Sequence, residues 1–265
     1  MNSVRETLIG VLTFLVLTIF AASCSESKSI VNDLPPLSAE CRNSVRVAAV
    51  IDESTSMSTS GTAPVKANEL RRLIDALAEC GGALGIGFVR EAPESGLERI
   101  EFPRPPLLPA APVRSPDEQD YEFDDRVAAF NQLRVDRGDA VESVLEKKKP
   151  EIDGYFRKVD DLLARPAAKG TDLNSALNAA EIFLSEPGIP PHCQKYLVIV
   201  SDGLDNRGRP LVAVKTDAAV LWINSTSAEK VLSRYRASRI ESFPSAVDFI
   251  VQSTKREDMN DANPK

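Results

Sequence analysis

Five oxygen-bearing side chains, spread over three segments of the chain, have the types needed to bind a hard divalent cation. Asp52, Ser54 and Ser56 stand at alternate positions, in a D-x-S-x-S pattern directly after an apolar run. Thr171 precedes an amphipathic stretch, and Asp202 follows a second apolar run. Mg²⁺ and Mn²⁺ take oxygen ligands of this kind, so the pattern predicts a site for one ion where the three segments converge.

Alternating strand and helix signals predict the elements that would bring these segments together. Such alternation is typical of an α/β domain with a doubly wound, mostly parallel sheet flanked by helices. The apolar run 45–51 indicates a strand buried on both faces, and the glycines of 83–89 indicate close packing. Further strands are expected at 99–102 (a sheet edge), 196–201, 218–223 and 239–243 (the last edge), and helices at 70–78, 172–186, 227–236 and 244–255.

The three segments together resemble the von Willebrand factor type A (vWA) family, whose metal-ion-dependent adhesion site uses D-x-S-x-S, a distant Thr and a distant Asp. The resemblance covers residues 44–255 and implies a vWA/Rossmann-like fold, with Asp52, Ser54, Ser56, Thr171 and Asp202 as metal ligands. Ser201 stands where the family often has Thr. Neutral hydroxyls leave the cation electrophilic, so the resemblance implies a partner protein that supplies an Asp or Glu oxygen.

Residues 103–168 form an insertion before the Thr171 loop. It begins with a proline-rich stretch, continues with an acidic run and then shows two helical patterns, 123–148 and 151–165, separated at Lys149-Pro150. We expect the insertion either to form a wall beside the metal and set specificity, or to serve as structural padding.

The beginning of the chain indicates export. An apolar run at 8–22 is followed by small residues and Cys24, which is typical of a lipoprotein signal over 1–24 with Cys24 as the lipidated residue. An ordinary cleaved signal and an uncleaved anchor are the alternatives. Residues 25–43 would then form a tether, and residues 256–265 a disordered tail. These features predict an envelope protein that contacts the membrane only through its lipid or anchor.

Export makes a disulfide expected among the remaining cysteines. Cys41, Cys80 and Cys193 each precede a predicted strand, so they belong at the sheet edge opposite the metal loops. We expect the pair Cys41–Cys193, with Cys41–Cys80 as the second choice and three reduced thiols as the remaining alternative.

Charge and motifs argue against several other functions. A net charge of −7 over 265 residues disfavours nucleic-acid binding, which needs a basic face. The sequence has no phosphate-binding loop and no G-x-S-x-G elbow, and His192, the only histidine, precedes its strand at the opposite edge from the serines. We therefore expect a metal-dependent protein-binding module and not an enzyme. The alternatives are an assembly component that uses the metal for stability and, least favoured, a Mg²⁺-dependent hydrolase.

Overall fold

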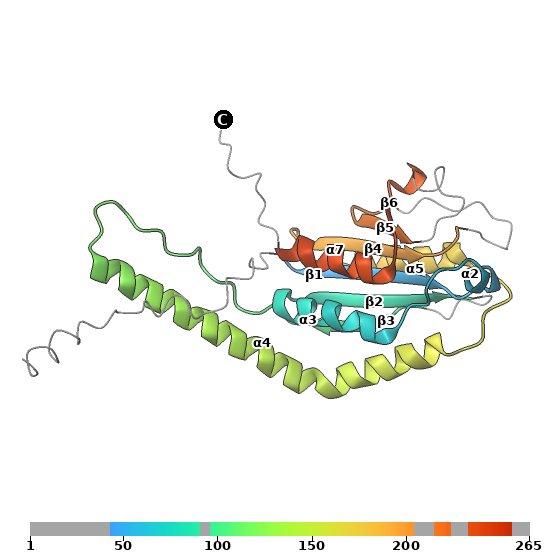
Figure 1. Cartoon of the computed structure of the whole chain (residues 1–265), viewed down its shortest axis with the longest axis horizontal. Coiled ribbons are helices and arrows are strands. Elements are labelled where there is room, and N and C mark those ends of the chain that lie inside the picture. Colours follow the sequence, from blue (N-terminus) through green and yellow to red (C-terminus); the bar gives the residue numbers. More distant parts are fainter. Residues whose placement is uncertain (1–42, 91–95, 204–214, 224–232, 256–265) are drawn as a thin grey trace, which may run out of the picture. The chain divides into compact units, whose positions relative to one another are not determined.

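A six-stranded sheet forms the centre of the computed structural model, which describes residues 43–90, 96–203, 215–223 and 233–255. The strand order is β3-β2-β1-β4-β5-β6 (Figure 1), and every pair is parallel except β2 with β3. The doubly wound, mostly parallel sheet predicted from the sequence is confirmed. The strands are β1 (Val45–Asp52), β2 (Gly82–Val89), β3 (Glu98–Phe102), β4 (Gln194–Val200), β5 (Ala219–Ile223) and β6 (Ser238–Ile240).

Helices cover both faces of this sheet, as the apolar character of the central strands requires. One face packs against α3 (Arg71–Cys80), α7 (Phe243–Lys255) and the later part of α4 (Asp120–Leu163). The other face packs against α5 (Leu173–Leu184). Two short elements, α2 (Thr55–Thr59) and the 3₁₀ turn η2 (Ala67–Leu70), connect β1 to α3.

The packing of β1 and β2 explains two features of their sequences. Residues of β1 alternate between the two apolar cores: Val47, Ala49 and Ile51 face one, while Ala48 and Val50 face the other. In β2, a Cβ added at Gly85 or at Gly87 would lie 2.7 Å from a side-chain carbon of Leu97. These glycines therefore serve close packing, as predicted.

The insertion differs from its prediction, because α4 is one helix of 44 residues and not two helices separated at Lys149-Pro150. Pro150 lacks the N–H that would bond the preceding turn, and such a residue bends a helix or ends it. Apolar residues on both sides of Pro150 pack against the same core, among them Val144, Leu145 and Ile152, so tertiary packing outweighs the missing hydrogen bond. Figure 1 shows α4 changing direction in its yellow-green part.

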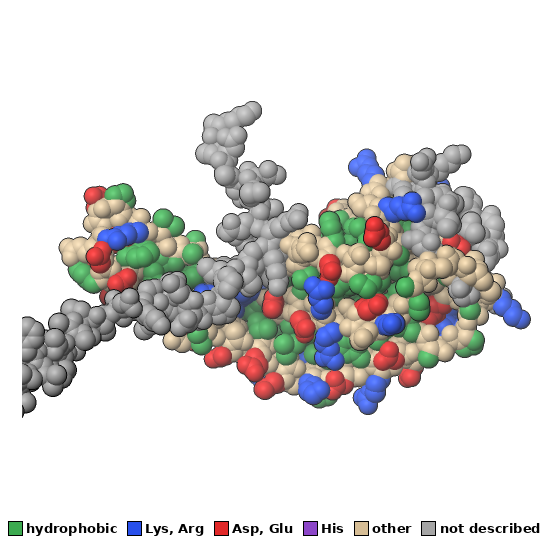
Figure 2. All heavy atoms as spheres, viewed as in Figure 1, with side chains coloured by type: hydrophobic (Ala, Val, Ile, Leu, Met, Phe, Trp, Pro, Cys, Tyr) green, Lys and Arg blue, Asp and Glu red, His purple; other side chains and the backbone are tan. Residues whose placement is uncertain are grey.

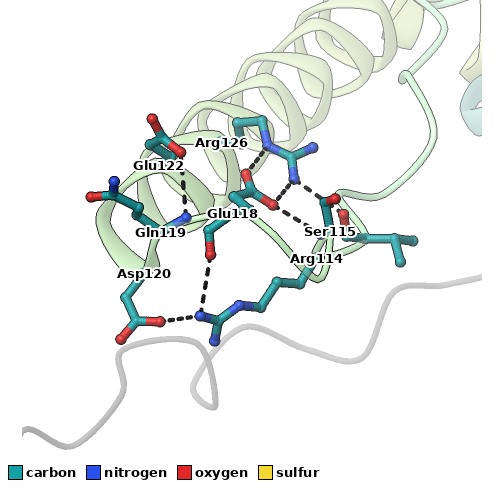
Figure 3. Close-up of polar contacts among 8 residues, drawn as sticks. Arg114, Ser115, Glu118, Gln119, Asp120, Glu122 and Arg126 are labelled. Atoms are coloured by element: carbon teal, nitrogen blue, oxygen red, sulfur yellow. Dashed lines mark hydrogen bonds and ion pairs between the residues drawn. The ribbon is translucent and has the colours of Figure 1, made fainter.

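A cluster of polar contacts fixes the beginning of α4 (Figure 3). The Glu118 carboxylate accepts hydrogen bonds from Arg126 Nε at 2.8 Å, from Arg126 Nη2 at 2.6 Å and from the backbone N–H of Ser115 at 3.1 Å. The Arg126 hydrogen bond is the main cause that lowers the pKa of Glu118. Arg114 also forms an ion pair with Asp120. The chain therefore enters the helix from the proline-rich stretch through a defined turn.

The cysteines correct one prediction. Cys193 is a free thiol, so the expected Cys41–Cys193 pairing is wrong. Cys80, at the end of α3, is disulfide-bonded. Sequence position placed the cysteines at one edge of the sheet, but pairing depends on the distance and direction of each side chain, which only the packed structure fixes.

Several predicted segments fall outside the described residues. They are the signal at 1–24 with Cys24, the tether at 25–43 except for its last residue, Asn43, and the tail at 256–265. Cys41 belongs to the tether and lies outside the described residues as well. Most of the helix predicted at 227–236 is also outside, although 233–235 are helical. The predicted strand 239–243 is observed as the shorter edge strand β6, followed by α7. Within the described ranges, no helix is long and apolar enough to cross a membrane.

Candidate metal site

Asp52 is the last residue of β1, and its carboxylate is buried at the carboxyl edge of the sheet. Asp52 Oδ1 accepts a hydrogen bond of 2.9 Å from the backbone N–H of Ser54, and Oδ2 accepts one of 2.8 Å from Ser201 Oγ. A carboxylate has about four lone-pair sites, so each oxygen keeps capacity for a further ligand. The two hydrogen bonds therefore orient Asp52 without saturating it.

The two serines of the D-x-S-x-S pattern lie side by side. Ser54 Oγ and Ser56 Oγ are 2.9 Å apart, and Ser54 is buried. Ser54 precedes the short helix α2, which contains Ser56. The tight turn from strand to helix thus brings both hydroxyls together just after Asp52.

The Thr171 segment is attached to the same loop through backbone contacts. Ser54 and Ala168 form an isolated parallel β-bridge. The N–H of Thr55 donates to the carbonyl of Ala168 at 3.2 Å, and the N–H of Ala168 donates to the carbonyl of Glu53 at 2.9 Å. Thr171, three residues further on, is buried, and Asp172 caps α5 by accepting a hydrogen bond from Ser175. Asp172 is therefore the helix cap, which leaves Thr171 as the candidate ligand of this loop.

Asp202 follows β4, the strand next to β1, and is buried at the same edge. Its negative charge is near enough to raise the pKa of Asp52. Ser201, beside it, donates to Asp52 and accepts a 3.1 Å hydrogen bond from the N–H of Gly203, while its carbonyl accepts one of 2.7 Å from Trp222 Nε1. The third segment therefore contacts the first directly through Ser201.

Burial is the largest cause of the raised pKa of Asp52, and the hydrogen bonds from Ser201 and Ser54 oppose it. Two buried carboxylates at one edge repel each other, and a cation between them would relieve that repulsion. The donor set of two carboxylates and three hydroxyls consists of hard oxygens, so it fits Mg²⁺ or Mn²⁺. Among the described residues no group of three or more His, Cys, Asp or Glu could hold a metal.

Sequence reasoning missed the ion pair that joins this loop to the insertion. Glu53 directly follows Asp52, and its side chain is mostly buried and paired with Arg90. Arg90 Nη2 also donates to the carbonyl of Leu162, in the last turn of α4, at 3.1 Å. One signal was available: Arg90 directly follows β2, whose last residue, Val89, pairs with Asp52. Arg90 must therefore lie at the carboxyl edge of the sheet, close to the loop that follows β1.

A cavity of about 210 Å³ opens beside the candidate ligands. Its lining comes from the end of β1, including Asp52 and Ser54, from the loop 62–65, and from the end of α4 and the segment after it, including Leu163 and Arg165. The insertion thus reaches the edge of the sheet that carries the D-x-S-x-S loop.

The strand order, the antiparallel edge strand β3 and the D-x-S-x-S loop at the carboxyl end of β1 together define a vWA-like α/β fold. No protein-family model matches the sequence, and no curated protein matches it significantly.

Solved structures resemble the chain at low identity, so the likeness concerns the fold alone. The pilus adhesin SpaC from Lactobacillus rhamnosus GG, in its open conformation, is 10% identical with a TM-score of 0.43; the match covers 80% of this chain but only 30% of the adhesin. A von Willebrand factor type A protein from Catenulispora acidiphila is 14% identical with a TM-score of 0.37, over 80% of this chain and 42% of that one. Manganese-loaded TRAP protein from Plasmodium vivax is 13% identical with a TM-score of 0.37, over 81% and 74%.

Proposed function

We propose that this chain is a metal-dependent protein-binding module of the cell envelope, which holds one Mg²⁺ or Mn²⁺ and binds an Asp or Glu side chain of a partner protein. The observation that carries the proposal is the arrangement around Asp52. Its carboxylate is oriented by Ser54 and Ser201, the hydroxyls of Ser54 and Ser56 lie 2.9 Å apart, and Asp202 acts on it electrostatically.

The composition of the ligand set supports a binding role for the ion. Asp52 and Asp202 would hold the ion from two neighbouring strand ends, and Ser54, Ser56 and Thr171 would contribute neutral oxygens. With only two anionic ligands, a bound Mg²⁺ or Mn²⁺ would keep affinity for a carboxylate oxygen from outside. The carboxyl edge of an open α/β sheet is also where such folds generally bind ligands.

Location at the envelope rests on the sequence of the first 24 residues, with Cys24 as the lipidated residue in our proposal. An acidic chain with a net charge of −7 gains little from general attraction to acidic partners. A local cation at the sheet edge would supply the missing positive charge.

A second candidate function follows from the exposed beginning of the insertion. Leu107, Val113 and Tyr121 are 60%, 81% and 61% exposed, and Figure 2 shows hydrophobic side chains at the projecting start of α4. A partner could bind this surface, with the metal serving stability only. In that case partner binding would persist in EDTA while thermal stability falls.

Calorimetric titration of Mn²⁺ and of Mg²⁺ into the full-length chain tests the proposal. We expect saturable binding of one ion, and Asp52→Ala should abolish it because the variant removes an anionic ligand. Asp124→Ala is the matched control: it makes the same charge change on the exposed surface of α4 and should bind the ion like the wild type.

Circular dichroism of each variant separates loss of a ligand from loss of the fold. A folded wild-type chain that binds neither ion would contradict the proposal. A folded Asp52→Ala variant that still binds one ion with unchanged affinity would contradict the assignment of Asp52.

A further inference from the structure

The cavity beside the candidate ligands has walls from three separate parts of the chain. Asp52 and Ser54 belong to the D-x-S-x-S loop, Val65 to the loop before α3, and Leu163 and Ala167 to the end of the insertion. A ligand atom held at the candidate ligands would therefore lie next to this cavity, and neighbouring atoms of the same ligand could enter it.

The insertion wall of the cavity is fixed to the metal loop. Arg90 contacts both Glu53 and the carbonyl of Leu162, so one partly buried side chain joins the D-x-S-x-S loop to the last turn of α4. The reciprocal hydrogen bonds of Ala168 with Glu53 and Thr55 attach the segment that follows. These contacts on both sides of Ala167 hold the wall in one position without a ligand.

The lining of the cavity favours an aliphatic group. Most lining side chains are apolar, among them Ile51, Met57, Leu163 and Val200. Its charged members are Asp52, Glu53 and Arg165, and the positive charge of Arg165 is near enough to act on Glu53. A mostly apolar lining favours an aliphatic group, while the candidate metal beside the cavity would hold the carboxylate.

The volume of the cavity suits an occupant the size of one side chain. Sites for drug-sized ligands enclose roughly 300–1,000 Å³, and this cavity is about 210 Å³. It opens to the surface, because Ala63, Pro64 and Ala167 in its lining are exposed. A side chain projecting from a partner's backbone can therefore enter.

We infer that this cavity is a specificity pocket, which takes an aliphatic side chain directly next to the partner's metal-binding Asp or Glu. The inference rests on the proposed function, because it places the partner's carboxylate at the candidate metal. The insertion, which forms one wall of the cavity, would then contact the residue beside that carboxylate and select for its type.

Two synthetic peptides test the inference with the full-length chain in Mg²⁺. Acetyl-Gly-Gly-Leu-Asp-Leu-Gly-Gly-amide places an aliphatic residue on both sides of the aspartate, and the Ser-Asp-Ser peptide of the same length lacks them. We expect the leucine peptide to bind at least tenfold more tightly by NMR titration, because burying one leucine side chain is worth about that factor or more.

Filling the pocket should remove this preference. Two variants, Ala167→Phe and Ala63→Phe, each introduce an aromatic ring at an exposed residue that lines the cavity, one on each wall. Either variant should reduce the difference in affinity between the two peptides to under about twofold. Ala164→Phe is the matched control, since Ala164 is exposed at the end of α4 but does not line the cavity. It should keep the tenfold preference.

The outcomes separate the two proposals. Equal Mg²⁺-dependent affinity of the wild type for both peptides would overturn the specificity pocket and leave the metal-dependent function standing. The same tenfold preference in folded Ala167→Phe and Ala63→Phe would also overturn the pocket. Absence of Mg²⁺-dependent binding of either peptide would overturn the proposed function, and the pocket with it.

Discussion

At the scale of single residues, Ser201 contributes more to the site than its place in the motif indicates. Its hydroxyl donates to Asp52 Oδ2 and accepts from the N–H of Gly203, while its carbonyl accepts from Trp222. It therefore couples the ends of β1 and β4, where the two candidate carboxylates stand. Threonine would offer the same hydroxyl, so the departure from the usual family residue keeps the chemistry.

Ser201→Ala should weaken the binding of Mn²⁺ by about 10- to 100-fold, the usual effect of removing a group that orients a metal ligand. The variant should also lose about 1–3 kcal/mol of unfolding free energy, because a buried carboxylate oxygen loses its donor. Ser201→Thr should retain both properties. Calorimetry and urea unfolding measure the two effects, and a Ser201→Ala variant with wild-type Mn²⁺ affinity would refute the orienting role.

At the scale of elements, the most consequential contact is the one between the end of α4 and the D-x-S-x-S loop. The partly buried Arg90–Glu53 ion pair and the Arg90 hydrogen bond to Leu162 join β2, the loop after β1 and α4. Burial raises the pKa of Glu53, and the positive charge of Arg90 is the strongest influence that opposes this rise. Arg90 thus helps to fix the end of the insertion at the edge of the sheet, together with the hydrogen bonds of Ala168.

Arg90→Ala should cost about 2–3 kcal/mol of unfolding free energy, because Glu53 would remain buried without its partner. Amide hydrogens of the segment 163–168 should also exchange faster. The double variant Arg90→Ala/Glu53→Gln should recover part of the stability, since the unpaired charge is gone, but not the slow exchange. Hydrogen exchange by mass spectrometry, with urea unfolding, distinguishes these results. Unchanged exchange in Arg90→Ala would show that the β-bridge at Ala168 alone holds the wall.

At the scale of the whole molecule, metal binding should appear as stability, because the candidate ligands come from three loops that only the folded chain brings together. Mg²⁺ at 100 times its dissociation constant should raise the free energy of unfolding by about 2.7 kcal/mol, and excess EDTA should reverse the gain. Asp52→Ala should show no gain. Thermal unfolding with and without Mg²⁺ checks this, and an equal gain in the variant would place the ion elsewhere.

Local patterns in the sequence were sufficient for the fold class and for the place of two candidate ligands, Asp52 and Asp202, at the ends of apolar strands. The apolar run ending at Asp52 makes β1 a buried strand, and parallel strands place their carboxyl ends at one edge. Asp52 and Asp202 therefore had to lie on neighbouring strand ends once β1 and β4 paired. The Ser54–Ser56 contact is equally local, since it follows from a tight turn into α2.

Tertiary packing decided what local patterns cannot contain. Pro150 indicated a helix break, but apolar residues on both sides of it pack against one core and keep α4 continuous. Cys193 is free although its position allowed a bridge. The hydrogen bond from Arg90 to the carbonyl of Leu162 joins residues more than 70 positions apart in sequence. Asp52 and Ala167, which line the same cavity, are also more than 70 positions apart. Periodicity reports which face of one element is buried, whereas contacts between elements depend on how all the side chains fit together.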